Sequence, residues 1–272
     1  MAFYGIVGLF TLMLLFMSPL QFVVLGWFLE EAQTHRVHEV SFGFIFVLSL
    51  VGVLAQLRKP AGKIAQMWQT AIPIWLVIVA IILIGEGLDA FILLFLVVPA
   101  ALMALHPGRP MLFHRVADPS RLLAAMTVVA AVPLLIFAVG EFRIGQDAAA
   151  VAGDVEISDD ESIDEVERKL RAAGDTPEEK EAAVHYGHWS AMAAFAVGIA
   201  TLGAPAALRL PGWRVPAWGA GLAAVIYGVV SLAYPEDASA ANSIWAALAI
   251  LWGVGFIGVA EAEGRSRPPA PA

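Results

Sequence analysis

Long apolar runs separated by short polar segments dominate this chain. At about 1.5 Å per helical residue, eight of them approach or exceed the length needed to cross a hydrocarbon core of roughly 30 Å. They cover residues 3–28, 40–57, 71–84, 90–105, 122–140, 189–208, 215–234 and 240–260. Because a spanning segment must satisfy its own backbone hydrogen bonds, the pattern predicts an all-α polytopic membrane protein with about eight transmembrane helices. The third run is short and adjoins the fourth through the segment from Gly85 to Asp89, so these two could instead form one re-entrant hairpin.

The composition agrees with a bilayer as solvent. Hydrophobic residues make up 60% of the 272 positions and charged residues 15%, a balance that soluble domains rarely show. The first run lacks a basic n-region and a small-residue cleavage site, so we expect it to remain in the mature protein. The chain has no cysteine, which excludes disulfides, thiolate metal sites and cysteine nucleophiles. Its net charge of -8 lies in the loops, and no basic stripe indicates nucleic acid as a partner.

Basic residues occur in every second loop. They follow the second, fourth, sixth and eighth runs: Arg58, Lys59, Lys63, Arg109, Arg115, Arg121, Arg209, Arg214, Arg265 and Arg267. The intervening segments are acidic overall. Since Lys and Arg concentrate in cytoplasmic loops, the alternation predicts a multi-pass protein of the cell membrane with both termini in the cytoplasm.

The two halves of the chain can be aligned with each other. The segment His35-Arg36-Val37-His38 corresponds to His185-Tyr186-Gly187-His188, Pro19-Leu20 to Pro133-Leu134, and Ile72-Pro73-Ile74-Trp75 to Val215-Pro216-Ala217-Trp218. This order predicts two tandem four-helix membrane repeats, residues 1–121 and 122–272, related by an axis along the membrane normal. Chance recurrence of Pro, Gly and Trp at membrane interfaces is the alternative.

An acidic segment at about 148–184 is inserted into the second repeat on its outer side. Ser158 with Glu161 is typical of a capping box, and it predicts an amphipathic helix that ends at Gly174. Thr176 and Pro177 predict a second helix that continues into the sixth span. The insertion could form a lid over the outer surface or a solvated loop without a role in a site.

Four histidines form the main candidate site. His35 and His38 lie three residues apart at the outer entrance of the second span, and His185 and His188 lie equivalently at the sixth. An i, i+3 spacing places each pair on one helical face, and imidazole is the commonest protein ligand for transition metals. The pattern predicts a transition-metal or haem site at the extracytoplasmic face with these four residues as ligands. A proton relay, or interfacial hydrogen bonding without chemistry, are the alternatives.

Carboxylates at the same depth could serve the histidines. Glu31 and Glu141 are the candidate catalytic residues, because either could orient an imidazole or transfer protons. Glu86 and Asp89 would be functional if they lay deep in the membrane, but their glycine neighbours favour a hydrated outer turn.

Tandem four-helix bundles, histidines at helix ends and an acidic residue shortly before His35-Arg36 resemble the heme A synthase family in outline. The resemblance implies a haem bound by His35 and His185. The motifs depart from that family, because Glu31 precedes His35 by four residues instead of three and the eighth predicted span contains no histidine.

Three functions therefore stand as hypotheses. The first is a membrane oxidoreductase with a metal or haem, acting on a lipidic or quinone-like substrate at the outer leaflet. The second is a proton-coupled or small-molecule transporter that uses Glu86, Asp89 and Glu141. The third is a non-catalytic subunit of a membrane complex, whose partner subunits would cover aromatic residues such as Trp245 and Trp252.

Overall fold

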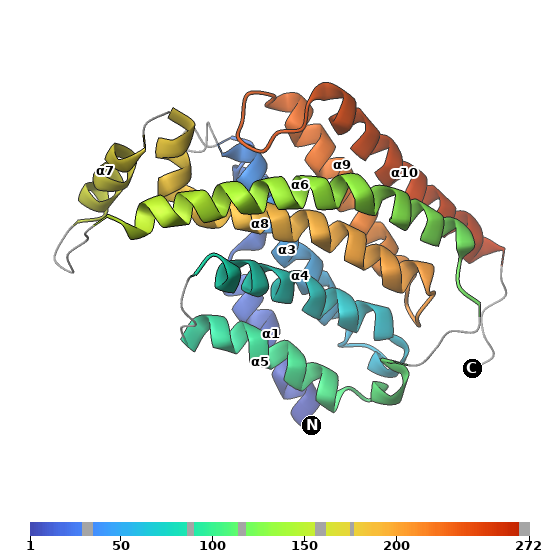
Figure 1. Ribbon diagram of the computed structural model, residues 1–272. Coiled ribbons are helices and arrows are strands. Elements are labelled where there is room, and N and C mark those ends of the chain that lie inside the picture. Colours follow the sequence, from blue (N-terminus) through green and yellow to red (C-terminus); the bar gives the residue numbers. More distant parts are fainter. Residues whose placement is uncertain (29–34, 86–89, 114–117, 156–161, 175–176, 267–272) are drawn as a thin grey trace.

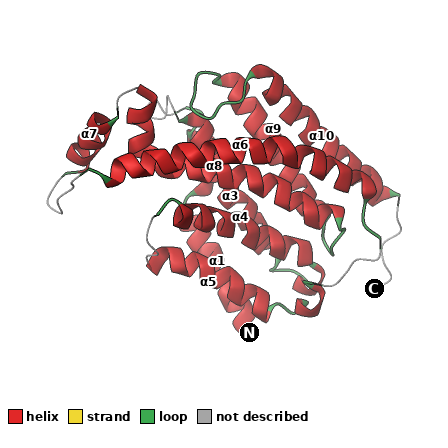
Figure 2. Cartoon of the chain, in the orientation of Figure 1, coloured by secondary structure: helices red, strands yellow, loops and turns green. Residues whose placement is uncertain are grey.

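The computed structural model describes residues 1–28, 35–85, 90–113, 118–155, 162–174 and 177–266. Within these ranges every regular element is helical, as Figure 2 shows. Seven helices are long and apolar enough to cross a membrane, and a further apolar helix over Ile92–Leu105 is shorter. The chain is an all-α polytopic membrane protein, as predicted, while the count of eight spans stays a prediction.

The first half of the chain forms α1 (Ala2–Phe16), α2 (Pro19–Leu25), α3 (Arg36–Ala55), α4 (Ile64–Leu83) and α5 (Ala90–Leu105), with a short 3-10 turn at Pro60–Gly62. The predicted first span is broken at Ser18, whose backbone is left-handed with φ of 48°. Pro19 explains the break, because proline cannot donate a backbone hydrogen bond and disfavours a helical conformation in the residue before it. α4 begins well before residue 71 and, by length and composition, is long enough to span a bilayer, so the third predicted run is part of a longer helix.

The second half forms a 3-10 turn at Arg109–Met111, then α6 (Arg121–Gly153), α7 (Ile163–Ala173), α8 (Pro177–Ala207), α9 (Arg214–Ala233) and α10 (Ser243–Arg265). α6 has 33 residues and α8 has 31, so each is over 45 Å long at about 1.5 Å per residue and exceeds the hydrocarbon core. Figure 1 shows the two lying side by side, with α7 near their far end. α8 continues through position 185 as predicted, whereas α6 extends beyond its predicted end at residue 140.

The amphipathic helix of the insertion exists, but it begins later than the predicted capping box. Its N-cap is Ser162, whose hydroxyl accepts a hydrogen bond from the Glu165 N–H. Ser158 and Glu161, the residues predicted to cap it, lie outside the described residues. The helix ends before Gly174, as predicted.

Four helices form the interior of the bundle. α3, α4, α8 and α9 are largely buried, whereas α1, α6 and α10 expose most of their apolar surface. In Figure 1, α9 and α10 lie on one side of the α6–α8 pair and α1, α4 and α5 on the other, while α3 passes behind the pair and packs against α4, α8 and α9. The outward side chains of α6 include Val128, Val129 and Ile136, each about two-thirds exposed at 66%, 70% and 71%. An apolar face of this size is expected to contact lipid.

The two ends of the bundle differ in character. α3 and α8 both begin at one end, which we call the histidine end because it contains His35, His38 and His188, and they finish at the opposite, basic end. The basic end is joined by a hydrogen bond from Ser120 N to Ala207 O at 2.7 Å and by an ion pair between Arg209 and Glu263. The segment before α6, the segment after α8 and the end of α10, which the charge pattern assigns to one side, therefore contact one another.

Candidate metal centre

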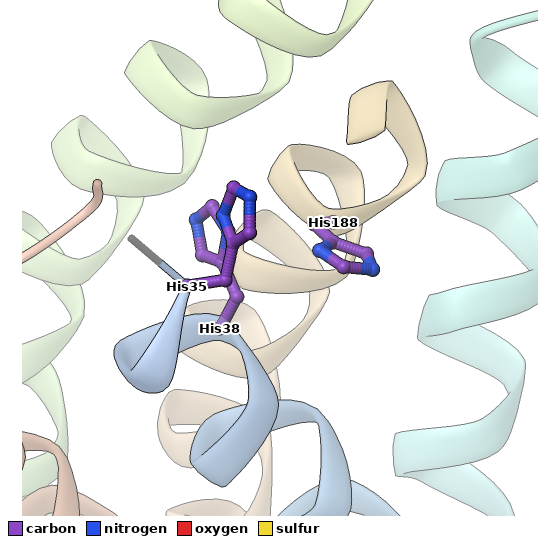
Figure 3. A group of neighbouring side chains, drawn as sticks. All are labelled: His35, His38 and His188. Atoms are coloured by element: carbon purple, nitrogen blue, oxygen red, sulfur yellow. The ribbon is translucent and has the colours of Figure 1, made fainter. Parts of the chain in front are cut away.

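Three imidazoles from two distant parts of the sequence converge at the histidine end. His35 and His38 project from the start of α3, and His188 projects from α8 (Figure 3). One ring nitrogen from each can be chosen so that all three lie within 4.8 Å of one another. The His35 and His38 rings are stacked with centroids 5.8 Å apart, and the His188 ring lies edge-on, 5.7 Å from each. The structure thus brings together three of the four predicted ligands. The side chain of His185 lies outside the described part of the chain.

The first turn of α3 is capped by a side chain other than that of His35. His35 occupies the N-cap position but makes no side-chain capping bond. Instead, Arg36 N donates to Asp237 Oδ2 at 2.9 Å, so a carboxylate from the α9–α10 loop caps the helix. Burial raises the pKa of Asp237, and the hydrogen bonds from the backbone of α3 oppose that effect. The cap leaves the His35 side chain available to the cluster.

The cluster is shielded from solvent on most sides. His35 is 6% exposed and His38 is 1% exposed, while His188 is half-buried. The indole of Trp189 packs edge-on against His38, with ring centroids 4.9 Å apart. Two of the three rings are therefore largely removed from solvent, and the third keeps part of its surface exposed.

Glu141 reaches the cluster through a serine. His38 Nε2 lies 2.6 Å from Ser239 Oγ, and the Ser239 hydroxyl donates to a carboxylate oxygen of Glu141. Glu141 lies on α6 and is 6% exposed. Glu141, a predicted catalytic residue, is therefore connected to His38 through the hydroxyl of Ser239. Glu31, the other predicted catalytic residue, lies outside the described residues.

Nitrogen donors in this number suit a single transition-metal ion. Imidazole binds zinc, copper, iron and nickel. In a tetrahedral zinc site with Zn–N near 2.05 Å, ligand nitrogens are about 3.3 Å apart, so the rings would need to approach by roughly 1.5 Å at most. Rotation about the side-chain bonds supplies movements of this size. Three protein ligands would leave a position for a fourth ligand or an external molecule.

The same geometry suits a haem less well. Two axial haem ligands face each other from opposite sides of a flat macrocycle. His35 and His38 lie one helical turn apart with nearly parallel rings, and His188 is close to both. The described side chains therefore favour one compact ion.

The remaining candidates lie elsewhere. Glu86, Asp89 and His114 fall outside the described residues. His106 lies at the basic end, where its Nε2 is 3.1 Å from Gln56 Oε1. It is buried in the segment that follows α5 and lies away from the cluster. Trp252 donates to Met126 O at 3.0 Å and packs inside the bundle, whereas Trp245 is 52% exposed. Of these two tryptophans, Trp245 is the more exposed and is the one that agrees with the subunit hypothesis.

Sequence reasoning missed Ser239 and Trp189. Ser239 is 201 positions from His38, and no spacing rule connects a loop serine to a helix so distant in sequence. Trp189 directly follows His188 and could have been noted as its neighbour.

Comparison with protein families, with characterised proteins and with solved structures finds no match for this chain. The geometry of the histidine end is therefore the main indication of function, because a fold alone does not determine activity.

Proposed function

We propose that the protein is an integral membrane metalloprotein that holds one transition-metal ion with His35, His38 and His188. The observation that carries this proposal is the convergence of three imidazole nitrogens within 4.8 Å. Two of the rings, those of His35 and His38, are largely removed from solvent. His185 precedes His188 by three residues on the same helix and is proposed as a fourth ligand.

The proposed activity is that of an oxidoreductase with a lipidic or quinone-like substrate. The metal would supply the redox chemistry, and the protein would supply ligands, orientation and exclusion of water. The cluster lies at the end of an apolar bundle, and a lipid-soluble substrate would have to approach it from the membrane. By the positive-inside rule, the basic end faces the cytoplasm and the histidine end faces outward.

The transporter hypothesis has less support. Charged side chains inside spans usually mark transport pathways. In the described parts of the four interior helices, the charged residues within a span are Arg36, Glu39 and Arg214, and all three lie in a first turn. On α6, Glu141 is buried within a span and is the residue on which the transporter hypothesis still depends. We therefore give the metal site precedence.

The first test is metal content. The protein is purified in detergent without chelators, and bound metals are measured beside His38→Ala, His188→Ala and His185→Ala. The matched control is His106→Asn, which changes a buried histidine at the basic end of the bundle, beside Gln56 at the end of α3. We expect stoichiometric copper or iron in the wild type and in the control, and a loss of about tenfold or more in affinity when a ligand is removed.

The outcomes separate the two parts of the proposal. If the wild type binds none of copper, iron, zinc or nickel after incubation with each, the metal centre is refuted. If it binds zinc alone, the metal centre stands but the oxidoreductase activity is contradicted, because zinc has no redox chemistry.

A further inference from the structure

His38 has two ring nitrogens, and its neighbours determine which one is available to a metal. The Ser239 hydroxyl carries a single hydrogen, which it donates to Glu141. Its oxygen must then accept a hydrogen bond from His38, whose Nε2 lies 2.6 Å away. Nε2 therefore carries the hydrogen of the neutral ring, and Nδ1 carries the lone pair.

We propose that Ser239 and Glu141 are positioning residues that direct His38 to bind the metal ion through Nδ1. This inference rests on the proposed metal centre. Metal-bound histidines almost always donate their other ring N–H to a carboxylate, a carbonyl or a water molecule, which fixes the tautomer and makes the ring a stronger ligand. Here the carboxylate acts through an intervening hydroxyl.

The fold holds the serine firmly in this place. Ser239 has a left-handed backbone with φ of 60°, a conformation that an L-residue adopts only when its surroundings favour it. Its carbonyl accepts a hydrogen bond from Tyr227 Oη at 2.9 Å. In the same loop, Asp237 accepts from Arg36 N, and Ala241 N donates to Ser231 Oγ at 3.2 Å. The loop is thus bound to both α9 and α3, and the hydroxyl lies between His38 and Glu141.

Glu141 also suits the electrostatics of such a site. Its carboxylate is buried on α6, and an unbalanced buried negative charge is expensive. A divalent cation held by neutral imidazoles leaves a net positive charge, which a nearby carboxylate would offset. The metal and Glu141 would therefore stabilise each other.

The experiment removes the hydroxyl without straining the loop. Glycine tolerates the left-handed backbone of position 239, so Ser239→Gly removes the side chain at little conformational cost. A second variant, Glu141→Gln, keeps the shape and an acceptor oxygen but removes the charge. The control, Ser231→Ala, removes a hydrogen bond to the same loop without affecting a contact of His38. Affinity for Zn²⁺ and Cu²⁺ is measured on the full chain by competition with a chelator.

We expect Ser239→Gly and Glu141→Gln to bind about 10- to 100-fold more weakly while the saturating stoichiometry is unchanged. The Ser231→Ala control should keep the wild-type affinity. In the metal-free wild type, nitrogen NMR of labelled histidine should show His38 protonated at Nε2, and this preference should weaken in both site variants. Adding Zn²⁺ should shift the Nδ1 signal.

Three results would overturn the inference while leaving the metal centre in place: wild-type affinity in both site variants, coordination through Nε2, or an equal loss in the Ser231→Ala control. A wild type that binds no metal would instead refute the proposed function itself, and the positioning role with it.

Discussion

His106 provides the sharpest test of how the basic end is held together. Its Nδ1 accepts a hydrogen bond from Gly108 N at 3.0 Å, so its Nε2 must carry the hydrogen that is donated to Gln56 Oε1 at 3.1 Å. His106 is 1% exposed and Gln56 is fully buried. The ring of Phe3 packs edge-on against the imidazole, with centroids 5.5 Å apart. The site is therefore dry and holds the neutral ring in one tautomer.

Changing His106 to Ala removes both bonds and leaves the Gly108 N–H and the Gln56 carbonyl oxygen buried without partners. Each such group costs about 1–3 kcal/mol, so the free energy of unfolding should fall by about 2–6 kcal/mol. His106→Asn keeps an acceptor near the place of Nδ1 and should lose about half as much. Reversible unfolding by sodium dodecyl sulfate in mixed micelles measures both values. A loss below about 1 kcal/mol for the alanine variant would refute the reasoning, because it would mean that water already satisfies these groups.

The same residue predicts a pH dependence. Burial lowers the pKa of His106 below its ordinary value of 6.5. As the pH falls below this value, the unfolded chain takes up a proton that the folded chain resists, so the free energy of unfolding decreases. Above it, the contribution of the neutral ring is fully present. The slope should be smaller in His106→Asn, and an identical slope in both proteins would contradict the assignment.

Two further predictions concern packing and orientation. Gly253→Ala places a methyl group of α10 against the backbone of α9 and should lower the free energy of unfolding by about 1–3 kcal/mol in the micelle assay. Gly258→Ala, on the same helix with no atom within 4 Å, should leave the free energy of unfolding almost unchanged. Equal effects of the two substitutions would contradict the close approach of α10 to α9. Because the chain has no cysteine, single cysteines at Arg58 and Glu236 can be labelled selectively: in intact cells an impermeant reagent should reach only position 236, and the reverse pattern would overturn the proposed orientation.

Hydrophobic periodicity and length were enough to predict the helices of this fold, because a bilayer requires long apolar segments with internally satisfied backbones. The helix ends were predicted less well. α6 continues past residue 140 because its polar outer part packs beside α8, a tertiary contact that hydropathy does not report. The sequence predicted the N-cap at Ser158, whereas the N-cap of α7 is Ser162. Ser162 and Glu165 have the same spacing as Ser158 and Glu161 and lie nearer to the apolar residues of the helix. Local signals that occur twice within a few residues cannot determine a boundary alone.

The candidate site was predictable to the extent that it depends on helical spacing. The i, i+3 pairs identified His35, His38 and His188, because the spacing fixes a common face. Ser239 and Asp237 could not be identified in the same way, because they reach α3 through a loop whose path depends on the packing of α9 against it. Asp237 belongs to one of the acidic segments, but the charge pattern indicates no role for it.

The proposed duplication and the proposed metal centre support each other. α4 begins at Ile64 and α9 at Arg214, both have 20 residues, and they are 150 positions apart; the same offset relates His38 to His188. Pro73 and Pro216 do not share this offset, so the helix bounds do not support that part of the alignment. Residues related by a twofold axis lie close together only when they lie near the axis, and the His38 and His188 rings have centroids 5.7 Å apart. A repeat that brings equivalent imidazoles to its axis would create a multidentate site from ligands of both copies. Contact with the Ser239–Glu141 pair then distinguishes His38 from His188.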